Sequence, residues 1–78
     1  MFKQAKIEDR VWNFTQGWGK ITEILPYGNK YPIVVTFDAG GTPENFIFTY
    51  EGYYLIDDLA PSLFWDEIKF DIPKKPLL

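Results

Sequence analysis

Short runs of β-forming residues, each closed by a turn-forming cluster, recur along most of the chain. Valine, isoleucine, threonine and aromatic residues favour extended strands, whereas glycine, proline and asparagine favour the turns between them. Runs that recur about every 8–14 residues are typical of small antiparallel barrels and sandwiches. The runs are residues 10–14, 18–25, 31–37, 45–50, 53–55 and a closing run over 64–72. The pattern therefore predicts an all-β, antiparallel domain of five to six strands.

One segment, residues 56–64, interrupts this strand pattern. Asp57 or Asp58 is placed to cap a helical turn, but Pro61 prevents a long helix. We therefore expect a short 3₁₀ or one-turn helix near residues 56–64. Residues 1–8 are expected to form an N-terminal arm and residues 73–78 a flexible tail, so that residues 1–78 make a single small domain.

Aromatic side chains have to supply much of the core, because the chain contains no Cys and no His. Disulfides and histidine-ligated metals are therefore excluded. Three Trp, five Tyr and seven Phe are present among the 78 residues. Since each such side chain buries about 150–250 Å², a few of them can replace many aliphatic residues.

The charges narrow the range of partners. Eight Lys and Arg against eleven Asp and Glu give a net charge of -3, and the basic residues are scattered along the chain. Nucleic-acid binding rests on a basic surface, so direct binding to nucleic acid is disfavoured. No apolar run approaches the roughly 18 residues of a membrane span, and no hydrophobic signal segment is seen. We expect a cytoplasmic protein without membrane contact.

Catalysis has little support in the residue types present. Without His or Cys, the usual general base and the usual soft nucleophile are missing. The carboxylate pairs Asp57-Asp58 and Asp66-Glu67 remain, but adjacent residues of a strand point to opposite faces. Neither pair converges readily on one substrate atom. We expect a protein that is not an enzyme and that needs no metal or cofactor.

Two glycine-bearing segments are informative together. Asp9-Arg10-Val11 is followed after a short gap by Gly17-Trp18-Gly19-Lys20-Ile21, and the third run continues as Val35-Thr36-Phe37-Asp38-Ala39-Gly40-Gly41-Thr42. Both segments resemble hairpins of Tudor-like, SH3-like small β-barrels. Examples are the C-terminal domain of UvrD/PcrA-type helicases and the RNA polymerase-interacting domain of CarD-type transcription factors. The resemblance covers residues 8–50 and implies that the paired glycines are structural turn residues: Gly17, Gly19, Gly40 and Gly41.

The sequence departs from this family pattern in three places. Glu8 stands where the pattern has Gly, Pro43-Glu44 lengthens the third hairpin, and the segment from Glu51 onward is longer than the closing strand of the family. The chain also looks like small phage and prophage proteins of unassigned function.

The resemblance also indicates which positions of the first hairpin face inward. Its inward positions correspond to Val11, Asn13 and Ile21. Because side chains alternate along a strand, the outer face then carries the candidate binding residues Arg10, Trp12, Trp18 and Lys20. Two outward Trp side chains would form an apolar patch, and such patches mark interfaces. The alternative is that the N-terminal arm or the C-terminal segment covers both indoles.

The family resemblance implies a non-catalytic module that docks on a protein partner such as RNA polymerase or a DNA-processing enzyme. For a phage-type protein, this would suit a modulator of a host protein. Two alternatives remain open: a nucleotide binder or sponge that uses stacked aromatics with Arg10 and Lys20, and a homo-oligomer paired through the Trp face or a barrel edge. An aromatic cage for a methylated cation is a weaker alternative, since no spacing demands that its candidate rings converge: Tyr27, Tyr31, Tyr50, Tyr53 and Tyr54.

Overall fold

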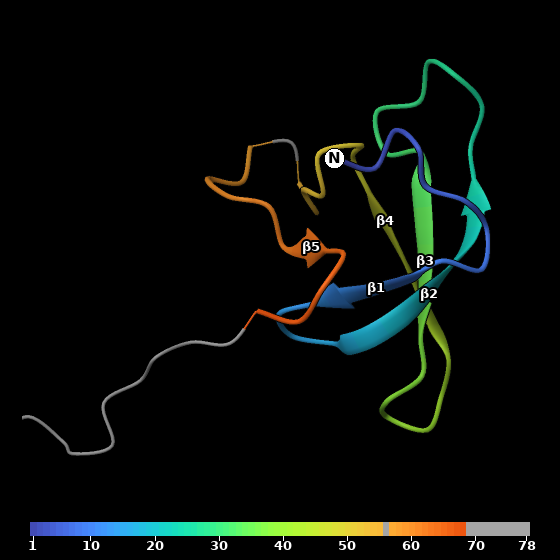
Figure 1. The fold of residues 1–78 in the computed structure, drawn as a ribbon, viewed down its shortest axis with the longest axis vertical. Helices are drawn as coiled ribbons and strands as arrows, with labels where there is room; N and C mark the ends of the chain where they lie inside the picture. Colours follow the sequence, from blue (N-terminus) through green and yellow to red (C-terminus); the bar gives the residue numbers. More distant parts are fainter. Residues whose placement is uncertain (56, 69–78) are drawn as a thin grey trace, which may run out of the picture.

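The computed structural model of the protein describes residues 1–55 and 57–68. Within these ranges, five antiparallel strands form one curled sheet with the order β4-β3-β2-β1-β5 (Figure 1). The strands are β1 (Arg10–Asn13), β2 (Gly17–Ile24), β3 (Ile33–Phe37), β4 (Glu44–Phe48) and β5 (Leu63–Phe64). The predicted all-β class is confirmed, and the curled half-barrel is consistent with a small SH3-like barrel.

The turn between β1 and β2 is organised by the side chain of Asn13. Its Oδ1 accepts hydrogen bonds from the Thr15 amide at 2.9 Å, the Thr15 hydroxyl at 2.8 Å and the Gln16 amide at 3.1 Å. Asparagine commonly caps turns in this way, because its short side chain reaches the amides that follow it. Gly17 completes the turn with a φ of 79°, a conformation that suits glycine.

The register of this hairpin places Trp12 opposite Trp18 and Arg10 opposite Lys20. Side chains on the other face point into the core, and the three inward positions implied by the family resemblance are all buried: Val11, Asn13 and Ile21. The alternation of the two strands is therefore as expected.

A bulge precedes β1 at Glu8. The Glu8 amide donates to the Ile21 carbonyl at 2.8 Å, while the Ile21 amide donates to the Asp9 carbonyl at 2.9 Å, so two residues oppose one. Glu8 has a φ of 85° and is the third residue of a turn closed by the Asp9 amide and the Lys6 carbonyl. This position of such a turn favours glycine. The backbone at Glu8 therefore has a conformation that suits glycine, and Glu8 is also the residue that stands where the resembling pattern has Gly.

Besides Gly17, two of the predicted turn glycines have clear structural reasons. A Cβ on Gly19 would lie 2.5 Å from the ring of Phe37 and 2.8 Å from the carbonyl oxygen of Thr36, so the strands approach closely only because this side chain is absent. Gly41 has a φ of 89° in the turn between β3 and β4. Gly40 has open space around it and no left-handed φ, so nothing in its surroundings requires glycine.

The segment after β4 differs from the expected short helix. The Asp58 amide donates to the Leu55 carbonyl at 3.0 Å, which closes a single turn, and residues 57–64 contain no helix. The amides of Ser62 and Leu63 both donate to the Gly52 carbonyl. These amides therefore bond outside their own segment, whereas a helix would require hydrogen bonds within it. The described residues also hold no helix long and apolar enough to cross a membrane.

Within the described residues, the closing strand predicted over residues 64–72 is represented only by β5, which spans Leu63–Phe64. β5 pairs with β1 through two residue pairs, Trp12 with Phe64 and Asn13 with Leu63. Residues 65–68 lie outside the strand. Residues 69–78, which include the predicted tail, lie outside the described part of the chain.

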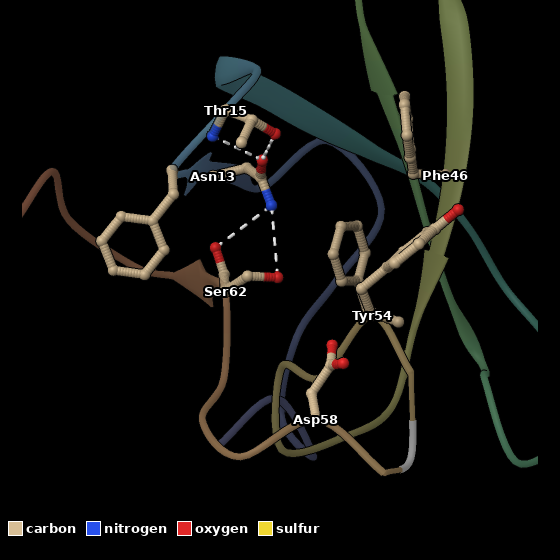
Figure 2. A pocket seen from close by; sticks show the side chains of 8 residues that line it. Asn13, Thr15, Phe46, Tyr54, Asp58 and Ser62 are labelled. Atoms are coloured by element: carbon tan, nitrogen blue, oxygen red, sulfur yellow. Dashed lines mark hydrogen bonds between the residues drawn. The ribbon is translucent and has the colours of Figure 1, made fainter.

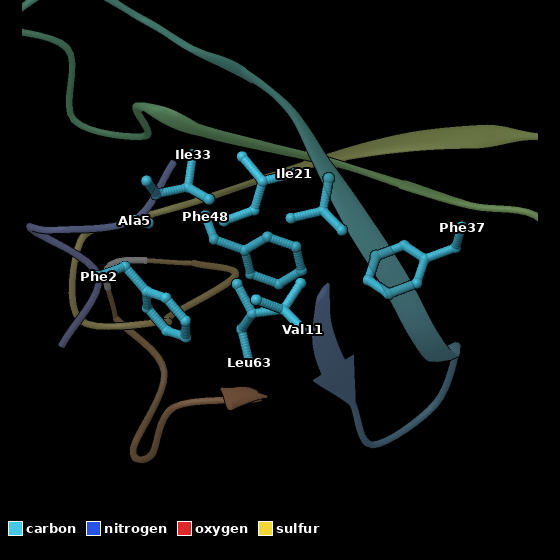
Figure 3. Packing of buried hydrophobic residues seen from close by; sticks show 9 residues of the cluster. Phe2, Ala5, Val11, Ile21, Ile33, Phe37, Phe48 and Leu63 are labelled. Carbon is cyan, nitrogen blue, oxygen red and sulfur yellow. The ribbon is translucent and has the colours of Figure 1, made fainter. Parts of the chain in front are cut away.

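The core fills the concave side of the sheet and draws on every part of the described chain (Figure 3). Phe2 in the N-terminal arm has no exposed surface, and its amide donates to the Tyr50 carbonyl at 2.7 Å. The arm is therefore a component of the core. The buried cluster consists of Phe2, Ala5, Val11, Ile21, Ile33, Val35, Phe37, Phe48 and Leu63.

Candidate binding face

A row of three aromatic residues crosses the outer face of the sheet from β2 to β5. Trp18 on β2 pairs with Trp12 on β1, and Trp12 pairs in turn with Phe64 on β5. Directly paired residues of antiparallel strands carry their side chains on the same face. Trp18 is 36% exposed, and Trp12 and Phe64 are half-buried. We call Trp18, Trp12 and Phe64 the aromatic row.

The two indoles of the row have different neighbours. The Trp12 ring lies 5.4 Å from Phe14 and 6.3 Å from Phe64, and these two phenyl rings are 5.2 Å apart in an edge-to-face arrangement. Such geometries are favourable for aromatic rings. Trp12 is thus partly covered by Phe14 and by Phe64 of β5, whereas Trp18 keeps more of its surface accessible.

The basic residues beside the row also differ in their interactions. The guanidinium of Arg10 lies over the Trp18 ring, 4.5 Å from its centroid, which is a cation–π contact. No carboxylate of the described residues lies within ion-pair distance of Arg10. Lys20 instead forms an exposed ion pair with Glu8 at 3.0 Å. Arg10 is therefore the cation on this face that has no anionic partner within the described chain.

A polar groove of about 310 Å³ adjoins the aromatic row. The Thr36 hydroxyl donates to Asn45 Oδ1 at 2.7 Å and lies 3.0 Å from the Thr22 hydroxyl, so β2, β3 and β4 are linked across this face. The lining of the groove combines an indole, two cations and a carboxylate. Its residues are Arg10, Trp18, Gly19, Lys20, Thr22, Thr36 and Asp38.

The N-terminal residues pack against Trp65, just after β5, at another part of the molecule. The Trp65 ring lies 4.8 Å from Phe2, and its Nε1 donates to the Met1 carbonyl at 3.3 Å. The N-terminal ammonium forms an ion pair with Glu51 at 3.3 Å. Phe2 belongs to the core on the opposite side of the sheet from the aromatic row.

The remaining candidate groups lie in separate places. Tyr50 and Tyr53 line one pocket, Tyr54 lines another, and Tyr27 is fully exposed. Asp57, Asp66 and Glu67 are exposed, and Asp58 accepts a hydrogen bond from the Leu55 amide at 3.1 Å. No group of three or more potential metal ligands occurs within residues 1–55 and 57–68.

Sequence reasoning identified four residues of this face and missed two. Arg10, Trp12, Trp18 and Lys20 do share the outer surface of the first hairpin. Phe14 and Phe64 were not expected there, and Phe64 reaches Trp12 through a pairing between distant parts of the chain. The sequence pattern that could have indicated Phe64 is the alternation of residues in the closing strand predicted over residues 64–72.

No protein-family model matches the sequence, and no curated protein or solved structure matches it significantly.

Proposed function

We propose that this protein is a non-catalytic binding module that docks on a protein partner through the aromatic row and Arg10. The observation that carries the proposal is the continuous row of Trp18, Trp12 and Phe64 on the face away from the core. Trp and Arg are the residue types that dominate binding energies at protein interfaces. The partner surface that fits this face is an apolar side chain next to a carboxylate, because Arg10 has no anionic partner within the described chain.

The resemblance to polymerase- and helicase-associated barrels supplies the first partners to test. Bacterial RNA polymerase and DNA-processing enzymes are those candidates. The likeness to phage proteins extends the proposal to a modulator of such a host protein.

A nucleotide is the second candidate ligand, and the polar groove favours it. Trp18 offers a ring on which a base could stack, and Arg10 and Lys20 offer charge for a phosphate. Against it, Asp38 also lines the groove, and Lys20 is already paired with Glu8. Both carboxylates oppose a bound phosphate, so the groove fits an anion less well than the aromatic row fits a protein surface.

The test compares two exposed aromatic residues. Trp18→Ala removes the most accessible member of the row, and Tyr27→Ala removes a fully exposed ring on the β2–β3 connection as the matched control. Purified bacterial RNA polymerase and a DNA-processing helicase are assayed for binding to the immobilised parent protein and both variants. We expect Trp18→Ala and Arg10→Ala to reduce binding at least tenfold, because a hot-spot side chain contributes roughly 2 kcal/mol or more.

Thermal melting accompanies each variant, and Trp18→Ala should melt within a few degrees of the parent. Equal binding by Trp18→Ala and Tyr27→Ala would exclude the aromatic row as the docking surface. Light scattering that finds a dimer dissolved by Trp18→Ala would favour the homo-oligomer instead. A nucleotide that stabilises the parent but not Arg10→Ala would favour the second candidate, since a ligand at about 100 times its Kd adds roughly 2.7 kcal/mol.

A further inference from the structure

A second pocket, of about 270 Å³, lies between the edge strand β4, the β1–β2 turn and the segment that follows β4. β4 contributes Phe46 and Phe48 on one side, and Asn13, Phe14 and Thr15 at the β1–β2 turn lie on the other. The segment after β4 adds Tyr54, Asp58 and Ser62 (Figure 2). This pocket is distinct from the groove beside Trp18, because the two share no lining residue.

Aromatic rings form the body of the pocket. The Tyr54 ring lies 5.9 Å from Phe46 and 6.0 Å from Phe48, and both pairs are tilted. Tyr54 is 44% exposed, so the ring is accessible from outside. Ring faces carry negative potential and attract cations as well as apolar groups.

Most polar side chains of the pocket are already engaged with each other. Asn13 Oδ1 accepts from Thr15 and Gln16, and Asn13 Nδ2 donates to the Ser62 carbonyl at 3.1 Å. The Thr15 hydroxyl donates to Asn13. These groups hold the pocket wall together, as the dashed lines in Figure 2 show.

Asp58 is the charged group of the pocket. Its half-buried carboxylate points into the space beside Ser62 and Tyr54 (Figure 2). One of its oxygens accepts from the Leu55 amide at 3.1 Å, and no Lys or Arg of the described residues lies within ion-pair distance. A negative charge next to aromatic rings is complementary to a cation that carries an apolar body.

We propose that this pocket binds a small primary amine with an aromatic body, its ammonium beside Asp58 and its ring against Tyr54 and Phe46. The ligand is small because the cavity, at about 270 Å³, is slightly below the volumes of roughly 300–1,000 Å³ that ligand pockets usually occupy. A primary ammonium can donate hydrogen bonds to the carboxylate in addition to its charge. The net charge of -3 of the whole chain also favours a cation over an anion.

The test uses three probes of similar shape and different charge: phenethylamine, phenethyl alcohol and 3-phenylpropionate. Binding to the full chain is followed by NMR shifts of the backbone amides. We expect the amine to shift the signals of Tyr54 and Asp58. It should bind about fivefold or more tightly than the alcohol, because a partly exposed charge contact contributes that much affinity. The carboxylate probe should bind more weakly than either.

Two Asn variants make the matched comparison. Asp58→Asn keeps an oxygen that can accept from the Leu55 amide, so the turn is retained while the charge is removed. Asp57→Asn makes the same charge change on the exposed neighbouring residue. We expect Asp58→Asn to remove the preference for the amine over the alcohol and Asp57→Asn to keep it. Equal binding of amine and alcohol to the parent, equal effects of the two variants, or shifts confined to the groove beside Trp18 would each overturn the proposal.

Discussion

Gly19 illustrates how a single missing side chain permits the local packing of this sheet. The Phe37 ring and the Thr36 carbonyl occupy the place where a Cβ would lie. We expect Gly19→Ala to lower the free energy of unfolding by about 1–3 kcal/mol, the usual cost of overpacking. Chemical denaturation measures the change.

Gly40→Ala is the matched control for this prediction, because no atom lies within 4 Å of the added Cβ. Its free energy of unfolding should stay the same or rise by about 0.4–1 kcal/mol, since alanine restricts the unfolded chain. If the two variants were equally stable, the close approach of Phe37 to Gly19 would be wrong.

At the scale of elements, Asn13 joins the first hairpin to the segment that enters β5. It is buried, and it bonds both the turn residues and the Ser62 carbonyl. We expect Asn13→Ala to cost about 2 kcal/mol or more, because several hydrogen bonds of roughly 0.5–1.5 kcal/mol are lost and the part-buried amides of Thr15 and Gln16 lose their partner. Hydrogen exchange should show the Leu63 amide losing protection before the amides of β3.

Ser62→Ala is the control for the Asn13 variant. It keeps the Ser62 carbonyl that accepts from Asn13 and removes the longer hydroxyl contact of 3.4 Å. Its stability should stay within about 0.5 kcal/mol of the parent, as for most substitutions that leave such a network intact. Equal protection of Leu63 in the parent and in Asn13→Ala would show that β5 does not depend on this link.

At the scale of the whole molecule, the N-terminal arm completes a core that the sheet alone leaves open. Phe2 is fully buried, and Trp65 and the Tyr50 carbonyl hold it in place. We expect Phe2→Ala to cost about 3–5 kcal/mol, the usual range for a buried Phe. A domain of this size has little stability in reserve, so the melting temperature should fall sharply.

Lys3→Ala, at the exposed neighbouring position, provides the control and should melt within a few degrees of the parent. A Phe2→Ala variant that melts at the same temperature as Lys3→Ala would place the arm outside the core. Neither Phe2 nor Lys3 lines the groove beside Trp18 or the pocket around Asp58.

Much of the candidate site could be predicted because it rests on local geometry. Strand alternation places Arg10 and Trp12 on one face, and the turn at Asn13 brings Trp18 beside Trp12. Phe64 was missed, since it joins the row only through pairing between β1 and β5, far apart in the chain. Phe14 was missed although strand alternation places it on the same face as Trp12. The pocket around Asp58 was missed for the same reason, because its walls come from three separate segments.

Local chemistry accounts for what could be inferred before the fold was known: β-forming runs, turn residues and the absence of Cys and His lead to a small all-β domain with an aromatic core. Distant contacts account for the rest. Residues 57–64 make no helix because the amides of Ser62 and Leu63 find the Gly52 carbonyl, and Phe2 is buried because the curled sheet leaves a space that it fills. These partners lie beyond the span of one strand or one helical turn, and periodicity along the chain carries no information about which separate segments will meet.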